Sequence, residues 1–439
     1  MFPKLTTAIP GPRSLALSQE LKKYECRNTT YTSEQWPIFW KKAEGVNIWD
    51  EDGNRFLDLT SAFGVAGLGH GWSAVAMRKQ SEELIHGMGD VHPTALKVDV
   101  CKRLSQMTFE KWGAGIGKTI LSNSGSEAVE SALKTALVVT GKRGIVGFKN
   151  SYHGLGYGSL LGSGMEKFRQ PFESQLANIR NVLDFPTDGV ADLAKLVEQL
   201  NDLDVSEVGA LIVEPIQGRA GKRVPPDGFL GILRSWCDVS GVVLIFDEIY
   251  TGFNRTGKLF ACEWDGVVPD IICVGKAMSG GYPISACVGK AEVMDAWPES
   301  EGEALHTSTF LGNPVGCAMA LAALEAHASL DVAERVAETG RILEKELRGM
   351  DNDLIDEIRG RGLMLGVELR YPDGSPAGDV AGVVLEDMLR RGIVMLADGA
   401  DGNTLAFTPP FDISEDEIQF IVHQVRNAIS SAVYQLVGK

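Results

Sequence analysis

One turn in the chain combines residue types that suit phosphate binding. The segment Ser122–Glu127 directly precedes a strongly amphipathic stretch, so its backbone N–H groups belong to a helix N-terminus, which attracts anions. Gly125 lets the backbone approach a ligand closely, and Ser126 adds a hydroxyl donor. The spacing of Ser124 and Glu127 is also that of a capping box. The turn alone therefore leaves a phosphate site and a structural cap equally open.

An aspartate ends the apolar run 242–246. The run is typical of a buried strand, so Asp247 should lie at the carboxyl edge of a sheet, where α/β proteins bind ligands. A carboxylate buried there needs a cationic partner or a shifted pKa. A protonated pyridine nitrogen is one such partner, and a metal ion or a ribose hydroxyl would be others.

Lys276 also follows an apolar run, residues 271–274. A desolvated lysine has a lowered pKa and a nucleophilic amine. A single strand-end lysine more often extends its amine to solvent. The company of the Ser122–Glu127 turn and of Asp247 favours the chemical interpretation, a lysine that holds a carbonyl cofactor as a Schiff base.

The elements that must position these residues alternate between short apolar strands and amphipathic helices, which predicts an α/β fold with a mostly parallel sheet. A helix is expected from Gly125, with Gly141 as its C-terminal cap. The strands expected most clearly are Gly144–Lys149, Val208–Glu214, Val242–Asp247 and Ile271–Val274.

The two ends of the chain differ from this middle region. Residues 46–59 predict a hairpin around Asp52-Gly53-Asn54. A helical stretch from about 331 leads to a strand at Gly362–Leu369 and a C-terminal helix near Glu415–Val437. We expect an N-terminal arm and part of a smaller α+β domain in residues 1–75, a large domain in 76–330, and the C-terminal part of the smaller domain in 331–439.

Composition excludes some classes of function. The 439 residues carry a formal charge of −16 and no long Lys/Arg run, which disfavours nucleic-acid binding. The seven cysteines have neither zinc nor redox spacing, and no apolar run is long enough for a membrane span. Prolines interrupt the N-terminus where a signal peptide would need an apolar core. These features predict a cytoplasmic protein with no metal site.

Six motifs together resemble the class III aminotransferases, of the ornithine, GABA and omega-amino-acid type, over about residues 49–413. These enzymes have the pyridoxal-phosphate (PLP)-dependent transferase fold type I, with a seven-stranded-type sheet. The motifs are 124–128 (SGSEA), 152–154 (YHG), 213–217 (VEPIQ), 247–257 (DEIYTGFNRTG), Lys276 and 308–314 (STFLGNP).

The resemblance implies roles for individual residues. Lys276 would bind PLP and move the proton of the substrate, and Asp247 would keep the pyridine nitrogen protonated. Tyr152 would stack on the ring. Thr309 would reach the phosphate of a neighbouring subunit, which implies a homodimer with shared active sites. The remaining expected cofactor contacts are Ser124, Gly125, Ser126, His153 and Tyr250, the last at a position where relatives often have glutamine.

The substrate pocket departs from the family pattern. Ala406 stands where many relatives have an arginine for the substrate α-carboxylate, and Arg219 stands where they have the glutamate that pairs with it. Either Arg219 has taken over carboxylate binding, or the substrate has no α-carboxylate, or Arg219 faces solvent or a local acid. Further candidate substrate contacts are Glu214, Trp36 and Phe63, although aromatic residues in such an arm are more often core.

The expected activity is transfer of an amino group between an amine or amino acid and a keto acid or aldehyde. A PLP-dependent racemase, epimerase, aminomutase or lyase would use the same Lys276 and Asp247. A scaffold protein without catalysis is the third alternative, but it would be expected to have lost one of these two residues.

Overall fold

The computed structural model describes residues 1–437, which form two compact units. One consists of residues 73–334, and the other of residues 1–72 together with the chain from 335 onward.

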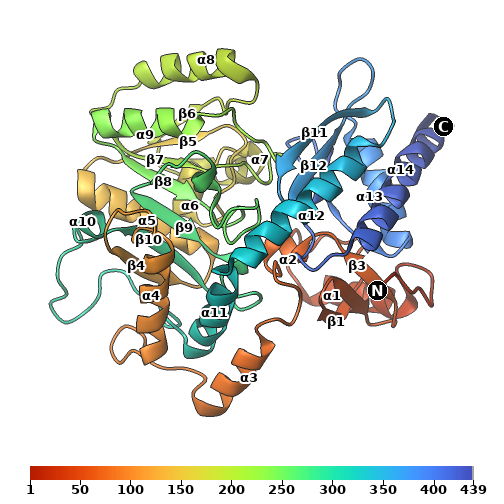
Figure 1. The fold of residues 1–439 in the computed structure, drawn as a ribbon, viewed down its shortest axis with the longest axis horizontal. Helices are drawn as coiled ribbons and strands as arrows, with labels where there is room; N and C mark the ends of the chain where they lie inside the picture. Colours follow the sequence, from red (N-terminus) through yellow and green to blue (C-terminus); the bar gives the residue numbers. More distant parts are fainter. Residues whose placement is uncertain (438–439) are drawn as a thin grey trace. The chain divides into compact units, whose positions relative to one another are not determined.

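The unit of residues 73–334 is built on a seven-stranded sheet of order β4-β10-β9-β8-β7-β5-β6 (Figure 1). Neighbouring strands are parallel except around β10, which is antiparallel to both β4 and β9. The strands are β4 (Gly117–Ser122), β5 (Gly144–Phe148), β6 (Arg180–Leu183), β7 (Val208–Val213), β8 (Val243–Asp247), β9 (Ile271–Val274) and β10 (Ser285–Lys290).

Helices cover both faces of this sheet. The long helices are α3 (Ala74–Glu83), α4 (Ala95–Met107), α5 (Gly125–Thr140), α8 (Gly189–Asn201), α9 (Phe229–Ser240) and α11 (Pro314–His327). The shorter ones are α6 (Tyr157–Gly162), α7 (Glu166–Arg169), η1 (Gln170–Gln175), η2 (Ala261–Trp264), η3 (Lys276–Met278) and α10 (Ala291–Met294).

Alternation along the strands divides the core into two layers. On β8, Val243 and Ile245 pack against α5, whereas Leu244 and Phe246 belong to the layer that includes α4, α8, α9 and α11. Each β8 residue is buried, which explains the uninterrupted apolar run in the sequence. Burial on both faces fixes β8 rigidly and with it the position of Asp247.

The carboxyl ends of neighbouring parallel strands meet at one edge of the sheet. Asp247 at the end of β8 is paired with Cys273 of the adjacent strand β9. Lys276 follows three residues after Cys273, just beyond the end of β9. β4 ends at the same edge, because Ser122 pairs with Ser285 at the start of β10. The fold thus gathers the turn before α5, Asp247 and Lys276 at one edge.

The other unit contains two four-stranded sheets, β1-β2-β3-β13 and β11-β12-β15-β14. Its strands are β1 (Trp40–Glu44), β2 (Asn47–Asp50), β3 (Arg55–Asp58), β11 (Ile355–Arg361), β12 (Met364–Leu369), β13 (Ile393–Val394), β14 (Leu396–Asp398) and β15 (Thr404–Phe407). Its helices are α1 (Pro12–Tyr24), α2 (Ser61–Gly64), α13 (Gly378–Arg390), α14 (Glu415–Val437) and most of α12 (Leu330–Arg348).

Most of the expected elements are present. The hairpin of residues 46–59 is β2–β3, and α5 ends at Gly141 with φ of +67°. The strand expected at 362–369 starts at Met364, because Gly362 (φ +58°) lies in the turn that joins it to β11. Strands β1, β4, β6, β10, β11, β13, β14 and β15 were not expected, since their runs are very short, polar or interrupted by glycine and give no clear pattern.

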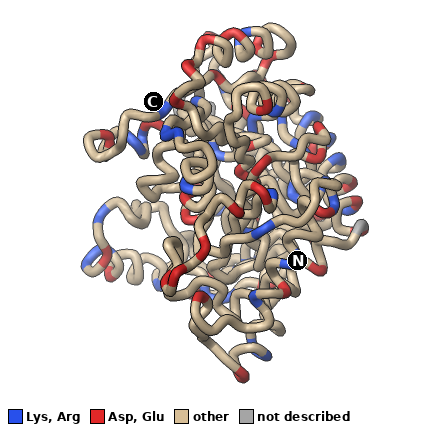
Figure 2. The backbone as a smooth tube through the Cα atoms, turned by 90° about the vertical axis from the view of Figure 1, so that its left-hand side faces the viewer, with Lys and Arg blue, Asp and Glu red and all other residues tan. Residues whose placement is uncertain are grey.

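The structure also shows where charged residues lie along the chain and how apolar its helices are. Acidic and basic residues are interspersed along the chain in the view of Figure 2. Within residues 1–437 no single helix is long and apolar enough to cross a membrane, and the bent pair Pro314–His327 and Asp331–Arg348 reaches that composition only when taken together.

Candidate active site

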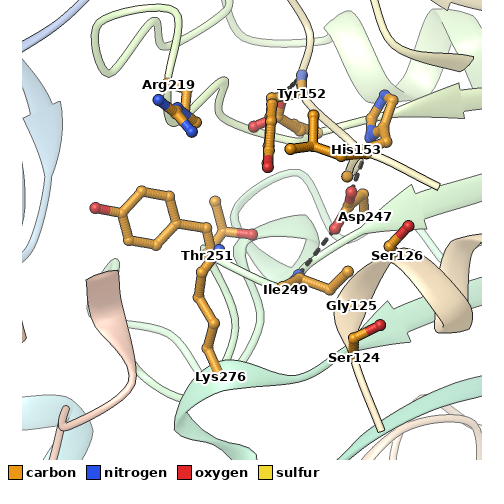
Figure 3. A pocket seen from close by; sticks show the side chains of 14 residues that line it. Ser124, Gly125, Ser126, Tyr152, His153, Arg219, Asp247, Ile249, Thr251 and Lys276 are labelled. Carbon is orange, nitrogen blue, oxygen red and sulfur yellow. Dashed lines mark hydrogen bonds and ion pairs between the residues drawn. The ribbon is translucent and has the colours of Figure 1, made fainter. Parts of the chain in front are cut away.

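A cavity of about 380 Å³ lies at the carboxyl edge of the sheet in the unit of residues 73–334 (Figure 3). Its walls come from the turn before α5, the loops after β5, β7 and β8, and the end of β9. The residues expected from the sequence that line it are Ser124, Gly125, Ser126, Tyr152, His153, Glu214, Arg219, Asp247, Tyr250 and Lys276.

The turn before α5 serves as a cap and as a cavity wall at once. The Ser124 hydroxyl accepts a hydrogen bond from the Glu127 N–H at 3.3 Å, so the structural cap is present. Gly125 and Ser126 nevertheless line the cavity. A Cβ atom on Gly125 would lie 2.8 Å from Cδ1 of Ile249, so glycine keeps this wall open. The two interpretations of the turn are therefore compatible.

The loop after β5 closes tightly on the Ser126 hydroxyl. Gly154 has a φ of +114°, and a Cβ atom there would lie 2.6 Å from the Ser126 Cβ. The Ser126 hydroxyl accepts from the Gly156 N–H at 3.0 Å and pairs with the Ser159 hydroxyl at 2.8 Å. These bonds hold Ser126 in one position beside the N-terminus of α5, where partial positive charge favours an anion.

The Asp247 carboxylate is buried and held from two sides. Its Oδ2 is 2.7 Å from Nδ1 of His153, and its Oδ1 accepts from the Ile249 N–H at 3.0 Å, as the dashed lines in Figure 3 show. His153 is itself buried, and its Nε2 has no hydrogen-bond partner among the described residues. The carboxylate is thus fixed in orientation at the end of β8.

Lys276 reaches the same cavity with a strained backbone. Its φ is +46°, and its Nζ lies 4.4 Å from the centroid of the Tyr250 ring. Burial lowers the pKa of the Lys276 amine, while Tyr250, Asp247 and Glu214 oppose the shift. An unprotonated amine is the nucleophilic form, so the site favours attack by Lys276 on a carbonyl carbon.

The loop after β7 presents Arg219 to the cavity. A pair of backbone hydrogen bonds between Gln217 and Arg223 closes the loop. The Arg219 guanidinium stacks on the rings of Tyr152 and Phe168, at 4.8 and 5.3 Å from their centroids. Figure 3 shows Arg219 on the far side of the cavity from Lys276. Within residues 1–437 no carboxylate forms an ion pair with Arg219.

Glu214 braces this loop. Its two carboxylate oxygens accept from the N–H groups of Tyr152 and Gly218, at 2.8 and 2.9 Å. Burial raises the pKa of Glu214, and the nearby His153 acts in the opposite direction. With both oxygens engaged by backbone, the carboxylate links the Tyr152 segment to the loop that carries Arg219.

The remaining expected residues do not line this cavity. Thr309 is exposed, in the loop before α11, where the neighbouring Ser308 accepts from Asn123 at 3.2 Å. Trp36, Phe63 and Ala406 belong to the other unit. There Trp36 packs on the core around Ile48 and Phe56, Phe63 is 64% exposed, and Ala406 is buried in β15.

Lys222 was missed by the sequence reasoning. It is fully buried, and its Nζ is 3.2 Å from the Tyr250 hydroxyl. A lysine in a glycine-containing loop is ordinarily a solvated residue, so no local pattern distinguishes it. Only the path of the loop reveals that it is enclosed.

These residues fit PLP. An amine faces the cavity for the aldehyde, a helix N-terminus with a fixed serine hydroxyl suits the phosphate, and a buried carboxylate suits a protonated ring nitrogen. The absence of side chains at Gly125 and Gly154 keeps the wall on the phosphate side free of atoms that would obstruct it.

Comparison with known proteins identifies relatives along nearly the whole chain. The family model described as aminotransferase class-III matches residues 29–429. The 4-aminobutyrate aminotransferase of Mycobacterium leprae is 35% identical, over 94% of this chain and 95% of that protein. The acetylornithine aminotransferase of Methanopyrus kandleri is 34% identical, over 91% of this chain and 96% of that protein.

Solved structures show the same fold. The ornithine aminotransferase of Toxoplasma gondii has 29% identity and a TM-score of 0.83, covering 98% of this chain and 97% of that one. A PLP-bound amine transaminase from an uncultivated Pseudomonas species has 27% identity and a TM-score of 0.85, covering 93% and 99%.

The chain belongs to the class III aminotransferase family. It is a PLP-dependent enzyme that transfers an amino group between an amine or amino acid and a keto acid or aldehyde. The fold class and the activity expected from the sequence are therefore confirmed. None of these relatives is named as a racemase, aminomutase or lyase.

Proposed function

We propose that Lys276 holds PLP through Nζ and that Asp247 pairs with its ring nitrogen. The observation that carries this proposal is their shared cavity: a buried amine with a lowered pKa and an oriented, buried carboxylate, together with the N-terminus of α5. Gly125 and Ser126 would hold the phosphate, and the Tyr152 ring, which lines the cavity, would stack on the cofactor.

When bound, PLP supplies an aldehyde that captures the substrate amine and a ring that withdraws electrons from the substrate α-carbon. Lys276 Nζ would accept the proton from that carbon, because burial lowers the pKa of its amine and so favours the unprotonated form. His153 keeps the Asp247 carboxylate oriented through the 2.7 Å contact. Tyr250, beside Lys276, would face the ring hydroxyl of the cofactor.

The most direct test is a half-reaction without acceptor. Purified protein loaded with PLP is mixed with 4-aminobutyrate, N-acetylornithine or ornithine, the amino compounds named in its relatives. The visible absorbance of the bound cofactor should bleach in one turnover and recover only when a keto acid is added. Unbleached absorbance with deuterium exchange at the carbon that bears the reacting amine would instead indicate proton transfer without amino transfer, which for the α-carbon of ornithine is racemisation. The Lys276→Ala variant is the inactive control.

We further propose that Arg219 binds the carboxylate of the substrate. It lines the cavity, and stacking on Tyr152 and Phe168 orients its guanidinium. A planar guanidinium suits bidentate binding of a carboxylate. Glu214 contributes by bracing the loop, rather than through a free oxygen aimed at the substrate.

Two substrates that differ only in the carboxylate test this role. A charge-assisted hydrogen bond contributes about 1.5–3 kcal/mol, so Arg219→Ala should raise KM for 4-aminobutyrate roughly 10- to 150-fold. Turnover of butylamine should not change. Arg143→Ala, an exposed arginine outside the cavity, is the matched control. An unchanged KM for 4-aminobutyrate would remove Arg219 from substrate binding.

We also propose a homodimer in which Thr309 reaches the phosphate site of the partner subunit. Thr309 is exposed, and its loop carries the exposed apolar residues Leu305 (77%) and Phe310 (57%), which suit an interface. Sedimentation equilibrium should give twice the chain mass, and Thr309→Ala should weaken PLP binding. A monomer with unaltered PLP affinity for that variant would contradict the proposal.

The seven free cysteines support a cytoplasmic location.

A further inference from the structure

Lys222 is a buried lysine directly behind the wall of the active site. It has no exposed surface. Its Nζ lies 3.2 Å from the Tyr250 hydroxyl, 4.5 Å from the centroid of the Tyr250 ring and 3.5 Å from the Gly218 carbonyl oxygen. Tyr250 lines the cavity, so this ammonium group is separated from the cavity by one side chain.

Two features of Lys222 are costly for stability. An ammonium group loses its hydration when it is buried, which costs free energy. Lys222 also has a φ of +56°, a left-handed conformation that costs a non-glycine residue about 1–3 kcal/mol. Such costs concentrate at functional sites, and Lys222 lies beside one.

Tyr250 joins Lys222 to Lys276. The two amines lie 4.5 and 4.4 Å from the centroid of the same ring, so they are separated by no more than roughly 9 Å, close enough for strong repulsion inside a protein. A lysine ammonium can only donate, so the phenol oxygen accepts from Lys222. The ring is thereby fixed against the Lys276 amine.

The charges around Lys276 oppose one another. The loss of solvent and, to a smaller extent, Lys222 disfavour its ammonium form, whereas Tyr250, Asp247 and Glu214 favour it. The other titratable groups that line the cavity are His153, Tyr152, Tyr250 and Arg219. Lys222 lies behind Tyr250, outside the cavity. Its positive charge opposes the effect of the two buried carboxylates on the pKa of Lys276.

We propose that Lys222 is a positioning residue. It fixes the Tyr250 ring against the Lys276 amine through the Tyr250 hydroxyl, and its charge opposes a second positive charge on that amine. The inference rests on the proposed role of Lys276. It assigns a role to a residue that does not touch the cavity.

The test measures how fast the apoenzyme captures PLP as a function of pH, followed by the visible absorbance of the bound cofactor. Only the unprotonated amine reacts. Removing a charge roughly 9 Å away at an effective dielectric constant near 20 should raise the pH midpoint of capture by about one unit. Below that midpoint, Lys222→Met and Lys222→Gln should therefore capture PLP about tenfold more slowly than the wild type.

Three comparisons separate charge from packing. Lys222→Gln keeps a donor for the Tyr250 hydroxyl but loses the charge, so it should shift the midpoint like Lys222→Met, and it serves if the methionine variant does not fold. Lys222→Arg keeps the charge and should restore the wild-type midpoint. Lys142→Met removes a partly buried lysine whose Nζ binds the Val205 carbonyl oxygen at 2.8 Å, and it should change nothing.

The outcomes also distinguish this inference from the proposed role of Lys276. Failure of the wild-type protein to capture PLP, or capture that survives in Lys276→Ala, would refute the role of Lys276. Normal capture by the wild type with the same midpoint in folded Lys222→Met or Lys222→Gln would overturn only the role of Lys222. A shift that Lys222→Arg fails to reverse would likewise overturn it, because a lost charge would not then be the cause.

Discussion

Replacing Gly154 by alanine tests how tightly the chain wraps around the Ser126 hydroxyl. The new Cβ would lie 2.6 Å from the Ser126 Cβ and 2.9 Å from its Cα, so the clash involves backbone and cannot be relieved by rotating a side chain. The φ of +114° adds strain for any residue other than glycine. Overpacking and backbone strain each cost about 1–3 kcal/mol, and we expect a loss of about 4 kcal/mol in the free energy of unfolding.

The same change should weaken the phosphate site. Ser126 must move to relieve the clash, and it lies at the N-terminus of α5, where it would bind the phosphate. PLP binding would have to return Ser126 to its original position. If the displacement relieves about 1.4 kcal/mol of strain in the apoenzyme, that amount is lost from the binding free energy and PLP binds roughly tenfold more weakly. Urea denaturation of the apoenzyme measures the stability, and equilibrium titration with PLP measures the affinity.

Gly302→Ala provides the matched control. Gly302 has a similar φ of +125°, but a Cβ atom there would meet no heavy atom within 4 Å. The free energy of unfolding of this variant should fall only by the cost of backbone strain, and the variant should bind PLP normally. If Gly154→Ala unfolds at the same urea concentration as Gly302→Ala and binds PLP equally well, the close approach of Gly154 to Ser126 is refuted.

Three further predictions follow from the site and the core. Asp247→Asn removes the buried charge and should lower kcat about 10²- to 10³-fold with the chain still folded, measured by steady-state kinetics and circular dichroism. Leu244→Ala leaves a cavity in the fully buried centre of β8 and should cost about 2–5 kcal/mol in urea denaturation. Burial lowers the pKa of His327 to about 3, so this side chain stays neutral in the folded protein while the unfolded chain gains a proton below about pH 6.5. Its contribution to stability is therefore lost as the pH falls from about 6.5 towards 3, by roughly 2–3 kcal/mol at pH 4.5. The stability difference between wild type and His327→Gln should shrink by that amount over this range.

Local patterns were sufficient for the centre of the sheet. The strands β5, β7, β8 and β9 were expected within one residue of their ends, because strands buried on both faces are continuous apolar runs. Helix α5 was also expected from its apolar face, with Ser124 and Gly141 as its caps. In each case the signal lies within a few adjacent residues.

Other strands were not predictable in the same way. Strand β10 contains Ser285 and Gly289, and its antiparallel direction follows from the chain reversal after Lys276 rather than from its composition. Strand β11 is partly exposed, and its polar residues give no continuous run. Such strands are stabilised by their neighbours, so their own sequence carries little of the information.

The sequence by itself singled out the residues that we propose do the chemistry, because Lys276, Asp247 and the turn before α5 each belong to a recognisable local motif. Only the tertiary structure brought them together, through the parallel pairing of β8 with β9 that places Asp247 and Lys276 at one edge. The tertiary structure also buries Lys222, because the loop after β7 places it beside Tyr250, which is 28 positions away in the sequence. Motifs and periodicity depend on neighbours along the chain, whereas burial and electrostatic coupling depend on neighbours in space. That is why the lysine proposed to hold the cofactor can be picked out from the sequence, while the charges that act on it cannot.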